Sequence, residues 1–581
     1  MKARSARDLD LRSFRWRAGL LLAVLTACAI GLGWRAVDLQ LVDHSFLARQ
    51  GDARFSRVLD IAAHRGTITD RYGEPLAVST PVDSIWVNPS ELALATDQIP
   101  RLAAALKLDR QDLERRITSN LEREFLYLAR GQEPAEAARI KALGIPGVYT
   151  SREYRRYYPA GEVTGHLLGF TNVDDAGQEG LELAFDHWLA GEDGAKRVIQ
   201  DRYGRIVQDV ESIRPPRPGR DLVLSIDLRI QYLAYRELKA AVREQRARAG
   251  SVVVLDVSTG EVLAMVNQPA FNPNDREQMQ AADYRNRAET DIFEPGSSIK
   301  PFWVAAGLAA GKYDPHSIID TSPGFIKVGT KIFEDEHNLG AINIATVLAK
   351  SSNVGMAHLA LSLAPQQVWT TLTRLGFGEV TTSGYPGESA GLLPPYAQWR
   401  PISIVTMSHG YGLSVTPLQL AHAYATVGSF GVARPVSFLA VDGPVAGERV
   451  LDARVCSELV GMLEQVVSLE GTAPLAAIPG YRVSGKTGTA WKAVPGGYST
   501  DRYMAVFGGV APATDPRLAA VVVLDEPNAG EHQGGQVSAP VFSRIVGGAL
   551  RLLAVAPDEP VGAEQLQASR HGNGVRTAAL P

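Results

Sequence analysis

Ser297 and Lys300 form the only Ser-x-x-Lys sequence in the chain, within the stretch EPGSSIK at residues 294–300. The Pro-Gly pair predicts a turn and the apolar residues 302–310 predict a helix, so Ser297 would begin that helix with Lys300 on the same face. A serine hydroxyl becomes a nucleophile when a base takes its proton. A lysine amine is such a base only if burial or a neighbouring cation lowers its pKa. The pattern alone also fits an N-cap serine beside a solvated lysine.

A second polar cluster, KSSN at residues 350–353, lies between segments that predict helices. Ser351 could relay a proton there, and Asn353 could hydrogen-bond an amide of a substrate. It is the only Ser-x-Asn sequence in the chain. Taken alone, the cluster would fit a polar helix cap.

The third candidate is KTGT at residues 486–489, which precedes a sequence that alternates like a strand. On a strand edge beside the nucleophile, Lys486 would offer a positive charge to a substrate carboxylate. Thr487 and Thr489 would offer hydroxyls, and Gly488 would allow close backbone approach. A second cation there would also lower the pKa of Lys300. Each motif is weak singly, but the ordered set indicates serine acyl transfer.

The stretch GYRVSGKT at residues 480–487 also fits a phosphate-binding loop, and VVVLDE at residues 521–526 resembles an acidic magnesium-binding strand. Such a loop needs a helix that starts at the lysine and directs its N–H groups at phosphate. The turn signal PGG at residues 495–497 follows too soon for that helix. We therefore expect a strand at Lys486, and nucleotide hydrolysis is the disfavoured alternative.

Composition argues against several other classes of protein. The 581 residues include 59 Lys and Arg and 63 Asp and Glu, for a net charge of -4. That balance excludes a globally basic nucleic-acid binder and a strongly acidic disordered chain. The two cysteines, Cys28 and Cys456, exclude a disulfide scaffold and a cysteine-rich metal site. Only 12 of the 59 basic residues are lysines, so the positions of the lysines are informative.

The N-terminus predicts a membrane anchor. Six basic residues precede residue 18, residues 18–34 carry no charge, and Trp16 and Trp34 occupy interfacial positions. We expect a cytoplasmic tail at 1–17, a transmembrane helix at 18–38 and an exported remainder. Two alternatives stay open: a cleaved signal peptide, and a lipoprotein acylated at Cys28. All three place most of the chain outside the cytoplasm.

The rest of the chain has two parts with different patterns. Residues 39–220 mix short strand-like runs with turn signals, contain a helix-like stretch at 102–117, and end in the linker RPPRPGR. The later residues predict a mixed α+β domain, with Asp227 capping a helix, mostly helices over 297–470, mostly strands over 480–525 and a closing helix at 540–553.

The order Ser297/Lys300, Ser351/Asn353 and Lys486/Thr487/Gly488 resembles that of the penicillin-recognising serine acyltransferases, which are penicillin-binding proteins and serine β-lactamases. A strand-rich module behind an anchor makes the chain similar to class B penicillin-binding proteins. Within that class, its motif residues are similar to those of the division type (FtsI-like, penicillin-binding protein 3). Further matching pieces are Arg65-Gly66 with Asp70-Arg71 and Gly73, RYYPAG at 156–161 with His166, Gly180-Leu181-Glu182, and FEPG at 293–296.

The resemblance implies an α+β chain with a single N-terminal transmembrane helix and an extended, strand-rich pedestal (dimerisation-type) domain at 50–218. A transpeptidase domain at 222–553 would contain a five-stranded antiparallel sheet sandwiched by helices. A disordered tail would occupy 554–581.

The resemblance also implies a mechanism. Ser297 would attack the D-Ala–D-Ala carbonyl of a peptidoglycan stem peptide, with Lys300 as general base and Ser351 passing the proton to the leaving amine. Asn353 would hold the donor amide, and Lys486, Thr487 and Thr489 would bind the terminal carboxylate. Backbone N–H groups of Ser297 and Thr489 would form the oxyanion hole. The resemblance implies no cofactor and no metal.

Two positions qualify the resemblance. His532-Gln533 precedes Gly534-Gly535, where division-type members often carry aromatic residues, and this puts the β-lactam profile in doubt. Tyr411 could line the pocket by the same resemblance, or it could be a packed core tyrosine.

The partners that the resemblance implies are peptidoglycan stem peptides, lipid-linked nascent glycan, β-lactams, the membrane, a SEDS-type glycosyltransferase (FtsW-like) and other division proteins, with no nucleic acid. The implied location is the bacterial inner membrane, with the catalytic domain in the periplasm. The alternatives are an elongation-type transpeptidase, a catalytically weak scaffold of the division machinery, and a hydrolytic D,D-carboxypeptidase or β-lactamase.

Overall fold

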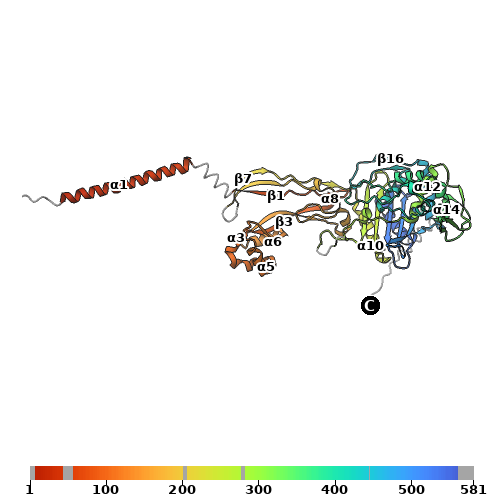
Figure 1. Ribbon diagram of the computed structural model, residues 1–581, viewed down its shortest axis with the longest axis horizontal. Helices are drawn as coiled ribbons and strands as arrows, with labels where there is room; N and C mark the ends of the chain where they lie inside the picture. Colours follow the sequence, from red (N-terminus) through yellow and green to blue (C-terminus); the bar gives the residue numbers. More distant parts are fainter. Residues whose placement is uncertain are drawn as a thin grey trace, which may run out of the picture. The chain divides into compact units, whose positions relative to one another are not determined.

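The computed structural model describes residues 7–42, 56–200, 206–276, 280, 282–443 and 445–559. The chain divides into two compact units (Figure 1). The first unit comprises Met1–His64, Pro81–Tyr154 and Gly191–Pro218, and the second comprises Arg65–Thr80, Arg155–Ala190 and Gly219–Pro581.

The first unit begins with a long apolar helix. Helix α1 (Arg7–Val37) overlaps a helical stretch, Arg15–Gln40, that is long and apolar enough to cross a membrane. The expected transmembrane segment 18–38 lies inside this stretch. The helix starts at Arg7, so it also includes most of the segment expected as a cytoplasmic tail.

The first unit has a small apolar core within residues 85–145. Strands β1, β6 and β7 form an antiparallel sheet in the order β1-β6-β7. The remaining elements are η1 Asp38–Val42, β1 Ser56–Ile61, α3 Pro89–Leu92, η2 Ala93–Gln98, α4 Ile99–Leu106, α5 Arg110–Thr118, β4 Leu126–Gln132, α6 Pro134–Lys141, β6 Gly194–Gln200 and β7 Ile206–Arg214. Strands β3 (Pro75–Val87) and β5 (Val148–Tyr157) contain residues of both units.

The second unit is built on an antiparallel sheet of five strands in the order β10-β9-β19-β18-β17. Its central strand, β19, reads almost entirely as Val, Ala and Leu because helices cover both faces. Phe507 of β18 contacts Phe542 of α20, with ring centroids 4.8 Å apart. The next residue, Gly508, faces Tyr424 of α17. Since successive strand residues point to opposite faces, α20 and α17 lie on opposite sides of the sheet.

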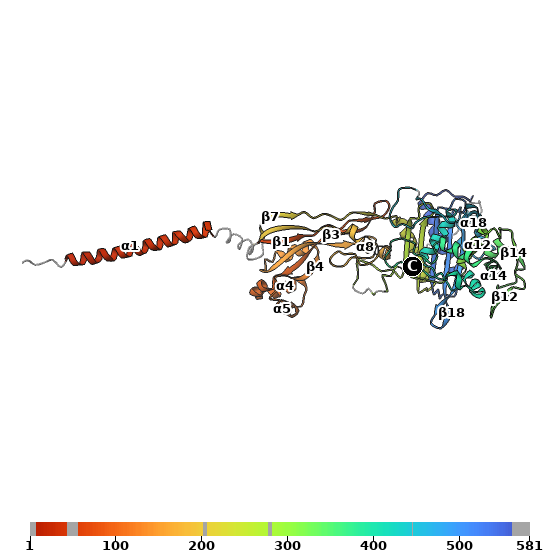
Figure 2. The same cartoon turned by 45° about the horizontal axis from the view of Figure 1, so that its top comes forward.

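Strand β17 is one of the two edge strands of this sheet, and its hairpin with β18 extends past the other strands (Figure 2). Pairing of β18 with β19 begins only at Met504, so residues 497–503 pair with β17 alone. The sheet strands are β9 Ala249–Asp256, β10 Val262–Gln268, β17 Ser484–Val494, β18 Gly497–Ala511 and β19 Leu518–Asp525.

Helices are the main regular elements of the segment between β10 and β17, but they hold less than half of its residues, whereas the sequence predicts a mostly helical segment over 297–470. They are α11 Arg287–Thr290, η4 Gly296–Ile299, α12 Lys300–Ala309, α13 Ile344–Ala349, α14 Asn353–Ser362, α15 Pro365–Arg374, η5 Tyr396–Gln398, α16 Pro401–Ser408, α17 Pro417–Gly428, α18 Ala453–Val467 and η6 Pro474–Ala476. Short strands interrupt them at β11 Ile318–Asp320, β12 Phe325–Val328, β13 Lys331–Glu334, β14 Ala341–Asn343, β15 Val432–Ala433 and β16 Glu448–Arg449.

The other elements of the second unit lie before β9 and after β19. They are β2 Ile68–Thr69, η3 Gly161–Val163, α7 Gly165–Leu168, α8 Gly180–Ala184, α9 Asp186–Leu189, β8 Leu222–Val223, α10 Leu228–Glu244, α19 Gly534–Val537 and α20 Ala539–Leu552. Asp227 caps α10, as the sequence predicts, by accepting a hydrogen bond from the Arg229 N–H.

Three further expectations differ from the structure. The helix-like stretch 102–117 is two helices, because Lys107 takes a left-handed conformation with φ of 56° and ends α4. The tail expected to be disordered from residue 554 is hydrogen-bonded as far as residue 559: the Tyr481 hydroxyl donates to the Val555 carbonyl, and the Arg482 N–H donates to Asp558. Residues 560–581 lie outside the described residues.

The third difference concerns the division into units. The sequence suggested one boundary near residue 220, but residues 65–80 and 155–190 belong to the second unit. Buried ion pairs explain this: Glu182 accepts hydrogen bonds from Arg65 (2.8 Å) and Arg156 (2.6 Å), and all three side chains are almost fully enclosed. Such groups tolerate burial only when they are paired, so the segments that carry them pack together.

Candidate active site

Ser297 and Lys300 lie on one face of a short helical segment. Ser297 belongs to the 3-10 turn η4, and Lys300 is the first residue of α12. A 3-10 turn has three residues per turn, so side chains at i and i+3 lie above one another. The turn is held by the Tyr424 hydroxyl, which donates to the Ser298 carbonyl at 2.9 Å. The structure therefore places Ser297 and Lys300 as their spacing predicts.

The Lys300 amine is fully buried and surrounded by oxygen atoms of the second motif. Its Nζ donates to the Ser351 carbonyl at 2.6 Å and to Asn353 Oδ1 at 2.8 Å, and it lies 3.3 Å from the Ser351 hydroxyl. Burial lowers the pKa of Lys300 to about 7, and the negative charge of Asp335 opposes this shift. A lysine with this pKa can exchange a proton near neutral pH, as a general base must.

The second motif forms a strained turn between α13 and α14. Ser351 has φ of 57°, a left-handed conformation that a non-glycine residue adopts at a cost of about 1–3 kcal/mol. Ser352 caps α14 by accepting a hydrogen bond from the Gly355 N–H at 2.8 Å. The polar helix cap that the sequence also allowed is therefore present at Ser352. Ser351 and Asn353 remain directed at Lys300.

The third motif lies on the edge strand β17, next to η4. Lys486 is fully buried, and burial together with the charge of Lys300 lowers the pKa of Lys486 well below its usual value. Its Nζ lies 3.1 Å from the Thr487 hydroxyl. A strand at this lysine also excludes the phosphate-binding loop, because no helix starts there.

Gly488 allows β17 to approach the turn that carries Ser297. A Cβ at Gly488 would lie 2.5 Å from the Pro295 carbonyl oxygen and 3.2 Å from the Ser298 backbone nitrogen. Thr489 follows it, and its hydroxyl accepts a hydrogen bond from the Gly534 N–H at 3.0 Å. The Thr487 hydroxyl lies 3.1 Å from that of Thr472. The close contact brings the third motif beside the first.

An aromatic cluster follows the third motif along β17. Tyr411 is half-buried, its hydroxyl accepts a hydrogen bond from the Trp491 N–H at 3.2 Å, and its ring lies edge-on to Tyr498 at 5.4 Å. His532, which differs from the residues expected for the division type, also packs on an aromatic ring: it stacks on Tyr503 with ring centroids 3.9 Å apart.

Sequence reasoning gave no role to two residues that lie near the motifs. One Glu294 oxygen accepts hydrogen bonds from the Gly412 N–H (2.6 Å) and the Tyr498 hydroxyl (3.0 Å). His409 Nε2 lies 3.0 Å from the Asn353 carbonyl, and burial, with the charge of Lys300, lowers the pKa of His409 to about 3. A charged residue directly before the Ser297 turn was the available signal for Glu294, whereas His409 lies 56 residues from its partner.

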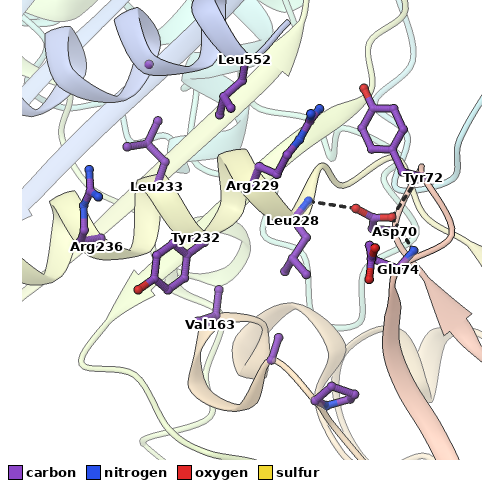
Figure 3. A pocket seen from close by; sticks show the side chains of 13 residues that line it. Asp70, Tyr72, Glu74, Val163, Leu228, Arg229, Tyr232, Leu233, Arg236 and Leu552 are labelled. Atoms are coloured by element: carbon purple, nitrogen blue, oxygen red, sulfur yellow. Dashed lines mark hydrogen bonds between the residues drawn. The ribbon is translucent and has the colours of Figure 1, made fainter.

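A hollow of about 1020 Å³ in the second unit is lined by none of the three motifs (Figure 3). Its walls include Tyr72, Tyr232 and Leu552. Figure 3 shows Asp70 beside it, where the carboxylate accepts hydrogen bonds from the N–H groups of Leu228 and Tyr72. Asp70 therefore joins the turn at 70–74 to the start of α10, which is a structural role. Among the described residues, no three His, Cys, Asp or Glu side chains are grouped as metal ligands.

A serine one turn before a buried lysine, beside a second buried lysine on the edge strand of an antiparallel sheet, defines a serine acyltransferase site. Comparison with known proteins gives the same class. Residues 250–547 match the family model of the penicillin binding protein transpeptidase domain, and residues 60–224 match that of the penicillin-binding protein dimerisation domain. The chain belongs to the class B penicillin-binding proteins, which carry a transpeptidase domain of the serine acyltransferase type.

Relatives match nearly the whole chain. Peptidoglycan D,D-transpeptidase FtsI of Escherichia coli K12 is 45% identical over 94% of this chain and 93% of its own length. The probable peptidoglycan D,D-transpeptidase PenA of Neisseria gonorrhoeae is 40% identical, with the same coverage of both chains.

Solved structures match as well. The transpeptidase domain of Burkholderia pseudomallei penicillin-binding protein 3 is 44% identical, with a TM-score of 0.54 over 58% of this chain and 98% of that one. Penicillin-binding protein 3 of Mycobacterium tuberculosis, complexed with aztreonam, is 29% identical, with a TM-score of 0.66 over 87% of this chain and 99% of that one.

Proposed function

We propose that this chain is a peptidoglycan D,D-transpeptidase that crosslinks stem peptides of the septal wall during cell division, and that Ser297 forms its acyl-enzyme. The observation that carries the proposal is the Lys300 amine, which is fully buried on the face of Ser297 and lies 2.8 Å from Asn353 Oδ1. The division role is supported by the FtsI of Escherichia coli K12, which is 45% identical over 94% of this chain.

The first half of the reaction forms the acyl-enzyme. Neutral Lys300 takes the proton from the Ser297 hydroxyl while Ser297 Oγ attacks the carbonyl carbon of the D-Ala–D-Ala peptide bond. The oxyanion that forms is stabilised by backbone N–H groups of Ser297 and Thr489. The proton returns from Lys300 through the Ser351 hydroxyl to the leaving amine, the peptide bond breaks, and D-Ala departs.

The second half forms the crosslink. The amine of a second stem peptide attacks the ester carbonyl at Ser297, its proton passes through Ser351 and Lys300 to Ser297 Oγ, and a new peptide bond replaces the ester. Asn353 holds the donor amide throughout. Lys486, Thr487 and Thr489 bind the terminal carboxylate of the donor, with Gly488 permitting the close approach of β17, and Tyr411 lines the pocket beside them.

β-Lactams would acylate Ser297 by the same first half. The ring carbonyl takes the place of the D-Ala–D-Ala carbonyl, and the opened ring stays attached because no residue is assigned to activate a deacylating water.

We retain the boundaries 50–218 for the pedestal domain and 222–553 for the transpeptidase domain as part of this proposal.

The cellular setting follows from the N-terminal charges. The six basic residues before residue 18 would keep the N-terminus in the cytoplasm and export the catalytic domain to the periplasm. There it would act with a SEDS-type, FtsW-like glycosyltransferase, which supplies nascent glycan strands, and with other division proteins.

The detergent-solubilised full chain should form a covalent adduct with a fluorescent penicillin and should join a D-Ala–D-Ala donor to an amine acceptor. Penicillin binding without a crosslinked product would favour a scaffold, and rapid hydrolysis of the adduct would favour a carboxypeptidase or β-lactamase. Depletion of the protein from its host should produce filaments; round cells would indicate an elongation enzyme.

A further inference from the structure

Asp335 lies outside the three motifs, directly after β13, and its carboxylate accepts three hydrogen bonds from the start of α14. Oδ2 accepts from the Ser352 hydroxyl at 2.6 Å. Oδ1 accepts from the N–H groups of Asn353 at 2.5 Å and Val354 at 3.1 Å. A single side chain thus binds three consecutive residues that lie 17–19 positions further along the chain.

These donors explain why a carboxylate is needed at this place. The first N–H groups of a helix have no partners inside the helix, and a negative charge at a helix N-terminus is stabilised by the helix dipole. The Ser352 hydroxyl already accepts from the Gly355 N–H, so it caps one of these groups. Asp335 accepts from two more and fixes the rotamer of the capping hydroxyl, because that hydroxyl donates to it.

The turn held in this way is the one that surrounds the Lys300 amine. Lys300 Nζ donates to the Ser351 carbonyl and to Asn353 Oδ1, and it lies 3.4 Å from the Ser352 carbonyl oxygen. Asn353 is also fixed through its side chain, since its Nδ2 donates to the Glu334 carbonyl at 3.1 Å. The left-handed Ser351 stores backbone strain, so the turn would relax unless neighbouring groups held it.

We propose that Asp335 is a positioning residue that holds Ser351 and Asn353 in place around the Lys300 amine, an inference that rests on the function proposed above. Asp335 touches neither Ser297 nor Lys300 in a hydrogen bond that the structure records, so it acts through the turn. Its role differs from that of the three motifs, whose side chains face the reacting groups.

The charge of Asp335 gives the proposal a readout beyond stability. The ionisable groups that face Lys300 come from three elements: Asp335 after β13, Lys486 on β17 and His409 after α16. Asp335 is the only acid among them, and its charge raises the pKa of Lys300 against the lowering by burial. Removal of this charge should therefore lower the pKa of Lys300 and move the acid limb of acylation toward lower pH.

Two substitutions separate geometry from charge. Asp335→Asn keeps an oxygen that can accept from the N–H groups of Asn353 and Val354, but it removes the charge. Asp335→Ala removes all three acceptors. Glu336→Gln is the matched control, because Glu336 is an exposed neighbour for which the structure records no hydrogen bond.

The experiment measures the rate constant of acylation by a fluorescent penicillin from pH 5.5 to 9 for the full-length protein and the three variants, with the melting temperature of each. We expect Asp335→Asn to shift the acid limb to lower pH by about half a unit or more. We expect Asp335→Ala to slow acylation by about 100-fold, which is within the range for loss of proton transfer. Glu336→Gln should behave as the parent protein.

Three results would overturn the proposal. One is an Asp335→Asn profile that coincides with the parent profile. Another is an Asp335→Ala variant that folds and acylates at the parent rate. The third is a loss of rate that follows the loss of melting temperature with an unmoved acid limb, since Asp335 would then only stabilise the fold. Failure of the proposed function is a separate observation, because the parent protein itself would then take up no penicillin.

Discussion

Lys300 Nζ lies 2.8 Å from Asn353 Oδ1, although 53 residues separate the two in sequence. The contact joins the first motif to the second, while the charge of Lys300 acts on Lys486 in the third. Three short patterns that are each ambiguous in sequence thus meet at one buried amine. The chemistry of the site depends on that amine being neutral.

Replacement of Lys300 by arginine should abolish the base. Burial lowers the pKa of Lys300 to about 7, so the neutral fraction, and with it the acylation rate, should rise as the pH increases through about 7. Arginine keeps its proton at any working pH. We expect Lys300→Arg to slow acylation by about 10²–10⁴-fold at every pH, measured with a fluorescent penicillin. Lys312→Arg, at an exposed lysine after α12, is the control; an active Lys300→Arg enzyme would contradict the role of the base.

Gly488 should tolerate no side chain. The Cβ of alanine would lie 2.5 Å from the Pro295 carbonyl oxygen, so β17 and η4 would have to separate. We expect Gly488→Ala to slow acylation by at least about tenfold and to cost about 1–3 kcal/mol of stability. Gly461→Ala, at an open and exposed site in α18, should instead be neutral or stabilising. Normal acylation by Gly488→Ala would show that the close approach is dispensable.

Glu182 should be essential for the fold of the second unit. Its carboxylate pairs with both Arg65 and Arg156, and glutamine would remove the one recorded ion pair of the buried Arg156 while Arg65 keeps its pair with Asp186. We expect Glu182→Gln to lower the free energy of unfolding by about 3–5 kcal/mol, measured by denaturant titration. Glu458→Gln, which breaks the more exposed pair with Arg454 in α18, should change it by less than about 1 kcal/mol. Equal effects of the two substitutions would refute the special role of burial.

Glu289 should make stability fall as the pH rises. Its side chain is fully enclosed, and burial, reinforced by the charge of Glu388, raises the pKa of Glu289 well above its usual value. The folded protein therefore holds a proton that the unfolded chain has lost above about pH 4.5, and stability declines by up to about 1.4 kcal/mol per pH unit until the folded-state pKa is reached. Glutamine does not titrate. The melting temperature of Glu289→Gln relative to the parent should thus increase from pH 5 to pH 8, and parallel curves would disprove the linkage.

The three motifs could be predicted from sequence because each is a short pattern whose local structure follows from neighbouring residues. The apolar stretch after Lys300 indicates a helix, and the turn at 495–497 leaves Lys486 on a strand. Both expectations agree with the structure. The spacing of Ser297 and Lys300 sets their shared face without help from the rest of the chain.

Other features depend on contacts between distant segments, which spacing does not reveal. In the sequence, Asp335 is one acid within a polar stretch, and its hydrogen bond to the start of α14 becomes evident only in the folded chain. Glu289 reads as a surface charge, yet it is buried. The pairs of Glu182 with Arg65 and Arg156 assign residues 65–80 and 155–190 to the second unit, although both segments precede the predicted boundary.

The central claim is that Ser297 carries the acyl group. Mass spectrometry of the full-length protein after exposure to penicillin should show the addition of one penicillin mass, located by peptide mapping to the peptide that contains Ser297. Ser297→Ala should show no addition, whereas Ser298→Ala, whose hydroxyl is buried against the Pro295 carbonyl, should still be labelled. Undiminished labelling of Ser297→Ala would contradict the account.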